Sequence, residues 1–277
     1  HCVSSELGDC VFLGNSSEGN AGAIDGNGST FPQRLTNCVL VGNSAGGDGG
    51  AYHGGGLLMN CLISDNTAGG KGGAGWFFGD GGNSKAAFVN CTIANNHAGL
   101  CGGTYIYYGG SFPIELHNTI IWGNTHSAAP GFEAQIATES FIKFAIKNAN
   151  IQDWAGQYPA TGVISVDPMW VDPIGPDGEP GTGDEDYGLQ TGSPCVDAGD
   201  NAVIGSDWAD LDQDTNVSEP NPLDGAWHDR RIDEPETPDT GAGTAPLVDI
   251  GAYEFRPQEH SLPLCYGDCD ESGTLDI

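Results

Sequence analysis

Polar and apolar positions repeat along residues 9–125 as short strands separated by turns. Each unit sets four or five apolar or β-branched residues between an Asn and a Gly/Asn pair, a pattern typical of a strand bounded by turn formers. The units are Asp9–Ser16, Asn37–Ala45, Asn60–Ala68, Asn90–Ala98 and His117–Thr125. Aligned on Cys10, Cys38, Cys61, Cys91 and Thr119, they are spaced by 28, 23, 30 and 28 residues. This period predicts a solenoid in which one repeat forms one coil.

Within each strand, the positions of one parity are apolar or small and should face the interior. They are Cys38, Leu40, Cys61, Ile63, Cys91 and Ile93. In a stacked coil, equivalent positions lie above one another at the strand spacing of ~4.8 Å. An Asn at the turn tolerates the left-handed conformation, and a column of Asn can pass hydrogen bonds along the stack. No window shows a convincing helical period, so the pattern predicts an all-β parallel solenoid.

Composition and charge narrow the class of protein. The chain has 277 residues, 45 of them Gly without a triplet period, and 38% hydrophobic residues, which excludes collagen and disorder. A net charge of −30 excludes a nucleic-acid surface and argues against binding anionic lipid. Residues 1–150 hold 10 Asp/Glu and 5 Lys/Arg, whereas residues 151–277 hold 28 and 3. The shift predicts a change of architecture near residue 150.

Nine Cys residues form an odd set. Those that recur at one repeat position predict a buried column of small apolar thiols, and a disulfide between stacked neighbours stays open as an alternative. The local pairs Cys2 with Cys10 and Cys265 with Cys269 are further candidates. The spacing lacks the close pairs of zinc sites, so a metal cluster is disfavoured.

The C-terminal tail carries the strongest signal for a metal ion. Oxygen-bearing side chains fall at positions 1, 3, 5, 7 and 9 of a calcium loop, with Gly273 at the sharp turn. They are Asp268, Asp270, Ser272, Thr274 and Asp276. Position 12 is missing because the sequence stops at Ile277, so we expect calcium in an intact protein and an acidic, frayed terminus in this stretch alone.

A second candidate for Ca²⁺ lies in an acidic loop. Its alternating oxygens are Asp210, Asp212, Asp214 and Asn216, and Glu219 follows. No Gly stands at the sixth position, so the loop is not an EF-hand. Crowded carboxylates repel one another unless an ion or solvent screens them, so a bound cation and a solvated acidic loop both remain open.

The order of motifs resembles that of secreted bacterial right-handed parallel β-helix proteins, pectate-lyase-like in fold. The motifs are "NCTIANN", "NTIIWGN", "NIQ", "VDPMWVDP", "DYGLQTGSPCVDAGD" and "VDIGAYEF". The distal motifs resemble a choice-of-anchor region, and "GDCDESGTLDI" is similar to the start of a dockerin-like calcium repeat. The resemblance implies β-helix coils over 1–165, an acidic loop-rich C-terminal cap over 166–257, and a linker with a partial calcium loop over 258–277.

Conspicuous residues of these motifs have structural interpretations. We expect the motif carboxylates to hold turns through Asx hydrogen bonds. They are Asp167, Asp172, Asp186, Asp197, Asp200 and Asp249. We expect Trp122, Trp170, Tyr253 and Phe255 to plug the open end of the helix core. Through residue 125 the cations are Arg34, Lys71 and Lys85, and none repeats in register with a carboxylate cluster, so no catalytic residue is predicted.

These observations favour a non-catalytic extracellular or cell-surface structural or adhesive protein, a piece of a larger secreted chain. The predicted partners are a second copy, which would assemble end to end into a homo-oligomer or filament, and a cell-surface glycan or anchoring partner. No nucleic-acid partner and no transmembrane segment are expected. The alternative is a carbohydrate-active protein, either a polysaccharide lyase or a binding module for acidic polysaccharide.

Overall fold

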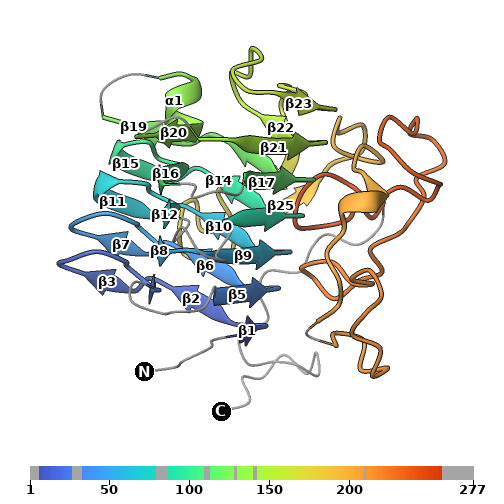
Figure 1. The fold of residues 1–277 in the computed structure, drawn as a ribbon, viewed down its shortest axis with the longest axis horizontal. Coiled ribbons are helices and arrows are strands. Elements are labelled where there is room, and N and C mark those ends of the chain that lie inside the picture. The colour runs from blue at the N-terminus through green and yellow to red at the C-terminus, as the bar shows by residue number, and fades with distance from the viewer. Residues whose placement is uncertain are drawn as a thin grey trace.

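The computed structural model describes residues 6–26, 33–78, 86–108, 113–127, 130–139, 142–208 and 210–257. The fold is all-β, a right-handed parallel β-helix whose stacked coils build four sheets, with an irregular C-terminal segment beside them (Figure 1). In the described residues the main helix is the short α1, Phe132–Gln135, and a 3₁₀ turn covers Asn201–Val203.

Each coil supplies one strand to each sheet in turn. The first sheet contains β1 (Glu6–Gly8), β5 (Gln33–Thr36), β9 (Gly56–Met59), β13 (Ala87–Val89), β17 (Ile114–His117), β21 (Phe144–Lys147) and β23 (Ala160–Thr161). The second contains β2 (Val11–Leu13), β6 (Val39–Val41), β10 (Leu62–Ser64), β14 (Thr92–Ala94), β18 (Ile120–Trp122) and β22 (Asn150–Ile151).

The other two sheets complete the coils. The third contains β3 (Ser16–Ser17), β7 (Ser44–Ala45), β11 (Thr67–Lys71), β15 (His97–Leu100) and β19 (Thr125–His126). The fourth contains β4 (Ile24–Asp25), β8 (Tyr52–Gly54), β12 (Gly75–Phe78), β16 (Thr104–Tyr108) and β20 (Ile136–Thr138). All strand pairs in these sheets are parallel; β24 (Trp170–Asp172) and β25 (Asp186–Leu189), in the C-terminal segment, pair antiparallel.

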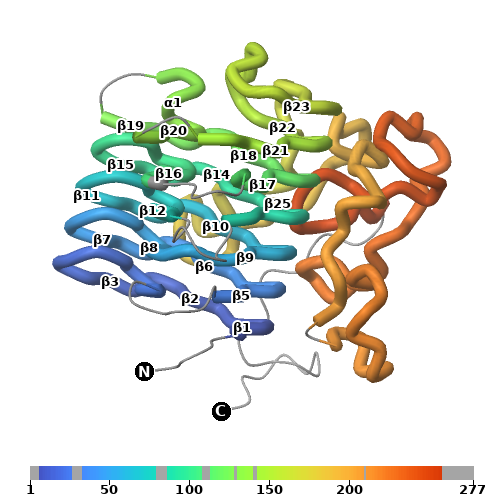
Figure 2. Tube along the Cα trace, in the orientation of Figure 1, coloured from blue at the N-terminus to red at the C-terminus, as the bar shows by residue number. Residues whose placement is uncertain are grey.

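The register confirms the alignment of the repeats. Leu62 pairs with Val39 on one side and with Thr92 on the other, and Thr92 pairs with Ile120. Equivalent positions therefore stack from coil to coil, as the tube in Figure 2 shows for the successive turns.

The predicted inward positions are buried. Cys38, Cys61 and Cys91, each 0% exposed, join Leu40, Ile63 and Ile93 in the core of the solenoid. The described cysteines are free thiols, so the disulfide alternative does not hold for the column. The Cys91 Sγ donates to the carbonyls of Val89 and Leu58 at 3.4 Å.

The fifth unit, His117–Thr125, keeps this bonding pattern without a thiol. The Thr119 Oγ1 donates to the His117 carbonyl at 2.8 Å and to the Phe88 carbonyl at 3.3 Å. These carbonyls correspond in the repeat to those that Cys91 uses. A small side chain with a hydrogen to donate therefore meets the requirement at this position.

The structure divides the predicted Asn roles between two columns. One lies at the turn from the second sheet to the third and consists of Asn15, Asn43, Asn66, Asn96 and Asn124. The Nδ2 of Asn43 donates to the Oδ1 of Asn66 at 2.9 Å, and Asn66 donates to Asn96 at the same distance. Asn124 then donates to the Oε1 of Gln135 at 2.8 Å. This Asn ladder satisfies buried amides along the stack.

The other column lies at the turn from the first sheet to the second and supplies left-handed backbone. Its members are Asn37, Asn60, Asn90, Asn118 and Asn148, with φ from 47° to 54°. Their side chains reach the C-terminal segment at several levels: the Nδ2 of Asn148 donates to the Ala198 carbonyl at 2.8 Å, and the Oδ1 of Asn118 accepts from the Asp200 amide at 2.8 Å.

The C-terminal segment lies along the side of the solenoid. Trp170, Tyr187 and Phe255 pack with Val39, Ile120 and other outward residues of the second sheet in a separate core cluster. Trp122 and Tyr253 pack against the same cluster. The prediction that the aromatic residues Trp122, Trp170, Tyr253 and Phe255 plug the open end is therefore wrong.

The top of the interior core in Figure 1 is covered by other aromatic residues. Phe132 of α1, Trp154 and Tyr158 pack against the interior core, and the Tyr158 ring lies 4.3 Å from that of Phe144. The prediction failed because the outward positions of the second sheet are also apolar, and these aromatic residues bury them.

Candidate functional site

An acidic loop between residues 207 and 219 forms the candidate metal centre. Its two ends are joined by the Asp207 amide, which donates to the Glu219 carbonyl at 2.8 Å, and by a bridge between Ser206 and Pro220. Leu211 is 4% exposed and anchors the middle of the loop. The backbone therefore brings carboxylates that are distant in sequence to one place.

Two overlapping groups of carboxylates result. In one, Asp210, Asp212 and Asp214 each offer an oxygen within 4.8 Å of the others. In the second, Asp207, Asp212 and Glu219 do the same, so Asp212 belongs to both. Ca²⁺ binds oxygens at 2.3–2.6 Å, so ligands around one ion lie up to about 5 Å apart. The spacing fits such an ion.

The predicted fourth residue has a different role. The Nδ2 of Asn216 donates to the Oε2 of Glu219 at 2.9 Å, and its Oδ1 accepts from the Ser218 hydroxyl at 2.8 Å. The structure thus groups three of the four predicted residues and adds Asp207, which the alternating pattern did not include. Asp207 is 0% exposed, and because burial cannot be read from the sequence, the alternating pattern gives no indication of its role.

Electrostatics in the loop favour a cation. The pKa of Asp207 is raised, first by burial and then by Asp212 and Asp210, although it accepts a backbone hydrogen bond from Leu211. The pKa of Glu219 is raised by burial and by Asp214 and Asp212. A bound divalent ion would relieve this repulsion.

The other predicted calcium residues, Asp268, Asp270, Ser272, Thr274 and Asp276, lie outside the described residues. Their role as ligands stays a prediction.

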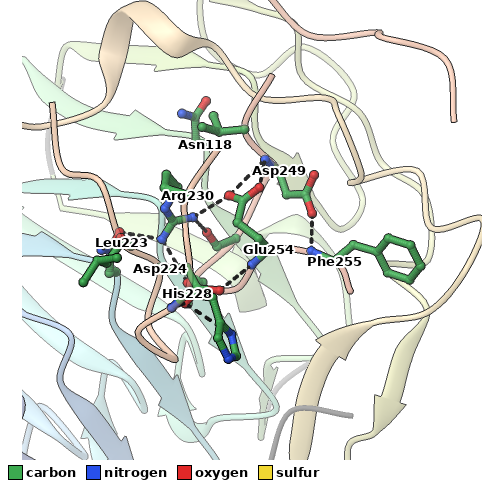
Figure 3. A network of polar contacts seen from close by, with 12 residues as sticks. Asn118, Leu223, Asp224, His228, Arg230, Asp249, Glu254 and Phe255 are labelled. Atoms are coloured by element: carbon green, nitrogen blue, oxygen red, sulfur yellow. Dashed lines mark hydrogen bonds and ion pairs between the residues drawn. The ribbon is translucent and has the colours of Figure 1, made fainter. Parts of the chain in front are cut away.

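A buried ionic network joins the C-terminal segment to the coils (Figure 3). Arg230 has 0% exposure; its guanidinium donates to the Glu254 Oε1 at 3.0 Å and to the Oδ1 of Asn60 at 2.7 Å. The Glu254 amide donates to the Asp224 Oδ2 at 2.9 Å. Asp249 accepts from the Phe255 amide at 2.6 Å. The network fastens the motif "VDIGAYEF" to the turn column.

Burial dominates the protonation of this network. The pKa of Asp249 is raised to about 7, mainly by burial, against backbone hydrogen bonds from Asp197 and Phe255 that lower it. The pKa of Glu254 is raised well above its usual value, mainly by burial and by Asp249, with Arg230 opposing. The raised pKa values of Asp249 and Glu254 therefore result mainly from their burial in this network.

The predicted Asx turns are confirmed for four of the six motif carboxylates. Asp167 accepts from the Met169 amide at 2.9 Å and Asp186 from the Gly188 amide at 2.8 Å. Asp200 accepts from the Ala202 amide at 2.9 Å. Asp172 accepts more weakly, at 3.2 Å from Gly175. Asp249 instead joins distant segments.

A hollow of about 470 Å³ opens beside the network. Its lining includes Gln190, Asp224, His228, Tyr253 and Phe255. The Asp224 Oδ1 is 3.8 Å from the His228 Nδ1 and also accepts from the backbone amides of Ala226 and His228. Asp224 is thus held as a turn-forming residue. The walls of the hollow come from four separate stretches of the chain, at residues 171, 188–191, 224–228 and 253–257, so no local pattern indicates it.

An aromatic column runs up the fourth sheet. His53 of β8 stacks on Trp76 of β12 with ring centroids 4.6 Å apart, and Trp76 stacks on Tyr107 at 5.0 Å. Tyr107 is 47% exposed. The Nζ of Lys71 lies 4.8 Å from the centroid of the Tyr105 ring. His53 is buried and the Trp76 ring is stacked between its two neighbours, so Tyr107 is the exposed ring of the column.

No helix of the described residues is long and apolar enough to cross a membrane. No protein-family model matches the chain, and a comparison with curated proteins finds no significant match.

Proposed function

We propose that the chain is a non-catalytic structural or adhesive β-helix protein of the bacterial cell surface or extracellular medium. The supporting observation is where the strongly perturbed carboxylates lie. Asp65 accepts from the Tyr187 hydroxyl at 2.7 Å, which joins the coils to the C-terminal segment, and burial raises its pKa to about 6. Glu254 pairs with Arg230, which also donates to Asn60 of the coils, whereas Asp249 accepts from the Asp197 and Phe255 amides within the C-terminal segment. Catalytic groups are usually perturbed inside a cleft. Glu254 lines the hollow described above, but its side chain is 1% exposed and is paired with Arg230, so its raised pKa is explained by burial in a structural contact.

The rigid rod follows from the ladders. Each coil repeats the same buried hydrogen bonds, and the C-terminal segment ties several coils together from the side. A solenoid presents strand edges at its ends, which pair with other edges unless they are covered. End-to-end assembly of copies is therefore part of the proposal, and a cell-surface glycan or anchoring partner is the other predicted contact.

Calcium is the cofactor of the proposal, held by Asp210, Asp212 and Asp214 with Asp207 and Glu219 nearby. The ion would stiffen the acidic loop. In calorimetric titration of the full chain with CaCl₂, the Asp212→Asn variant should lose one equivalent because Asp212 belongs to both groups. Equal stoichiometry in Asp212→Asn and in the parent would remove this loop as a calcium site.

Location and assembly test the main proposal. Immunogold labelling of producing cells should place the protein on the surface or outside, and sedimentation should show concentration-dependent association. Electron micrographs of the associated material should show a regular axial repeat. Label confined to the cell interior would overturn the proposal, and a monomer at all concentrations would remove end-to-end assembly from it.

The aromatic column favours a second candidate function, binding of a carbohydrate chain. The exposed Tyr107 ring, supported from behind by the stacked Trp76, can pack against the apolar face of a sugar ring, and a partner with both apolar and polar surface suits such a site. Asp25, 3.2 Å from the His53 Nδ1, and Glu139, which pairs with Lys71, place carboxylates near the column. An uncharged or cation-bridged sugar chain therefore suits it better than a free acidic one.

The test uses Trp76→Ala, with Trp227→Ala as the matched control because Trp227 is 50% exposed elsewhere. If the column binds glycan, affinity electrophoresis on polysaccharide gels should show retardation that Trp76→Ala abolishes and Trp227→Ala keeps. Formation of unsaturated uronate from polygalacturonate or alginate in the presence of calcium would instead establish a lyase and reverse the ranking.

A further inference from the structure

A second set of three carboxylates lies away from the loop discussed above, where the C-terminal segment folds back on itself. Asp197, Asp233 and Asp239 each offer an oxygen within 4.8 Å of the other two. Asp197 is 0% exposed, whereas Asp233 and Asp239 are exposed. The set thus has a buried base and two ligands at the surface.

The Asp197 side chain lacks the partners that its burial demands. Its Oδ1 is buried without a hydrogen-bond partner, and its Oδ2 accepts only a long bond of 3.3 Å from the Glu234 amide. A buried polar oxygen without a partner destabilises the folded state, and an ionised one does so more strongly. Asp167, Asp186 and Asp200 accept amide bonds within their turns, so Asp197 departs from the role predicted for it.

The surroundings of Asp197 are anionic. Burial is the largest cause of a pKa raised to about 6, and the charged neighbours that shift it, Asp233, Asp239 and Glu234, raise it further. A cation placed among the three carboxylates would supply the partner that the Oδ1 lacks and offset their repulsion.

The backbone already holds the two ends of the loop in place. The Asp197 carbonyl accepts from the amides of Thr240 and Gly241 at 3.0 Å, and the Thr237 amide donates to the Glu234 carbonyl at 2.8 Å. Residues 233–239 thus form a short turn whose ends both face Asp197. The loop backbone therefore needs little further ordering when an ion binds.

We propose that Asp197, Asp233 and Asp239 form a calcium site that clasps the 233–239 loop against the body of the protein. Three carboxylate oxygens up to 4.8 Å apart match metal–oxygen distances of about 2.4 Å, the range of Ca²⁺. Mg²⁺ requires about 2.0–2.1 Å and near-ideal octahedral geometry, so it should bind more weakly. Water completes the coordination at the exposed side. The site is independent of the proposed function and of the 207–219 loop.

Calcium titration of the full chain tests the stoichiometry. The double variant Asp233→Asn/Asp239→Asn changes only exposed ligands and should keep the fold. It should bind one equivalent less than the parent in calorimetry with CaCl₂, while Glu236→Gln, which neutralises an exposed residue of the same loop, should bind as the parent does. An unchanged stoichiometry and affinity in the double variant would overturn the site.

Proteolysis locates the effect. A glutamate-specific protease can cut after Glu236 only when the loop opens, so cleavage there should slow about 100-fold at free Ca²⁺ 100 times the Kd. Asp212→Asn should retain this protection, which separates the site from the 207–219 loop. The double variant should be cut at one rate with and without Ca²⁺; equal protection of the double variant would contradict the proposal.

Discussion

The solenoid and the C-terminal segment solve the same problem, buried polar groups, in opposite ways. In the coils, one bond is repeated: each ladder Asn donates to the next at 2.9 Å and every level resembles the one below. In the C-terminal segment each carboxylate has its own set of partners, and the buried Arg230 bonds Glu254, the Asn60 side chain and the Ala252 carbonyl. A repeat can satisfy polar groups by stacking, whereas a single covering segment must bring its own counter-charges.

This difference predicts that the largest loss of stability comes from Arg230. Arg230→Ala would leave the buried Glu254 without its counter-charge, and breaking such a pair costs about 3–5 kcal/mol. Urea unfolding should show this loss, while Arg231→Ala, at the exposed neighbouring position, should stay within about 0.5 kcal/mol of the parent. A loss below 1 kcal/mol would show that the network does not hold the segment to the coils.

The Asn ladder should respond next. Asn66→Ala would remove the acceptor of the Asn43 amides and the donor to Asn96, so we expect a loss of about 3 kcal/mol. Asn15→Ala, at the exposed end of the ladder, should cost about 1 kcal/mol or less. Chemical denaturation measures both. Equal losses at the two positions would mean that stacking within the ladder adds nothing to stability.

The stability of the C-terminal segment should depend on pH, with a sign that follows from the raised pKa of Asp249. The folded pKa of Asp249, about 7, lies above the unfolded value near 3.8, so the folded state holds its proton more tightly. The associated stability is present below about pH 4 and is lost as pH rises to 7. One such group changes the free energy of unfolding by up to about 1.4 kcal/mol per pH unit within that window.

Unfolding measured from pH 4.5 to 7.5 tests this. Asp249→Asn should be less stable at low pH, because an Asn cannot replace both acceptor oxygens, and its stability should fall less steeply as pH rises. Glu254, whose pKa is also raised, would leave some slope. Exposed Asp177→Asn serves as the control, and an undiminished slope in Asp249→Asn would assign the pH dependence to other groups.

The smallest effect is expected at position 119, because the repeat accepts either Cys or Thr at this place. Thr119→Cys would place a thiol against the His117 and Phe88 carbonyls, as Cys91 does in the coil below. We expect the free energy of unfolding in reducing buffer to change by less than about 1 kcal/mol. Thr119→Val keeps the shape but removes the donor, and it should lose more. The reverse order would show that volume alone governs this column.

Much of the solenoid could be predicted because its signals are local and repeated. The Asn-Cys-apolar units predicted both the register and the inward face of Cys38, Cys61 and Cys91. The single Asn role was too coarse, since one column supplies left-handed turns and another carries the ladder. The grouping of carboxylates in the acidic loop could also be predicted in part, because alternating Asp210, Asp212 and Asp214 lie within one short stretch.

The prediction of which residues cover the outer face of the second sheet was wrong, although the sequence contains a pattern that indicates them. Val39, Leu62 and Ile120 are apolar on the parity opposite to the Cys column. A strand apolar on both faces is typically buried on both. That pattern indicates that the outer face of the second sheet is covered, which agrees with the position of Trp170 and Phe255 at the side of the solenoid.

The coil is specified locally, because each unit carries its own strand, turn and inward residues and the units differ little. Which polar side chains meet in the C-terminal segment depends on the folded chain: Asn60 bonds Arg230, 170 residues away, and Asp197 lies with Asp233 and Asp239, and no local pattern joins these residues. The physical reason is that stacking propagates a local conformation, whereas docking depends on the burial and charge that a distant segment brings.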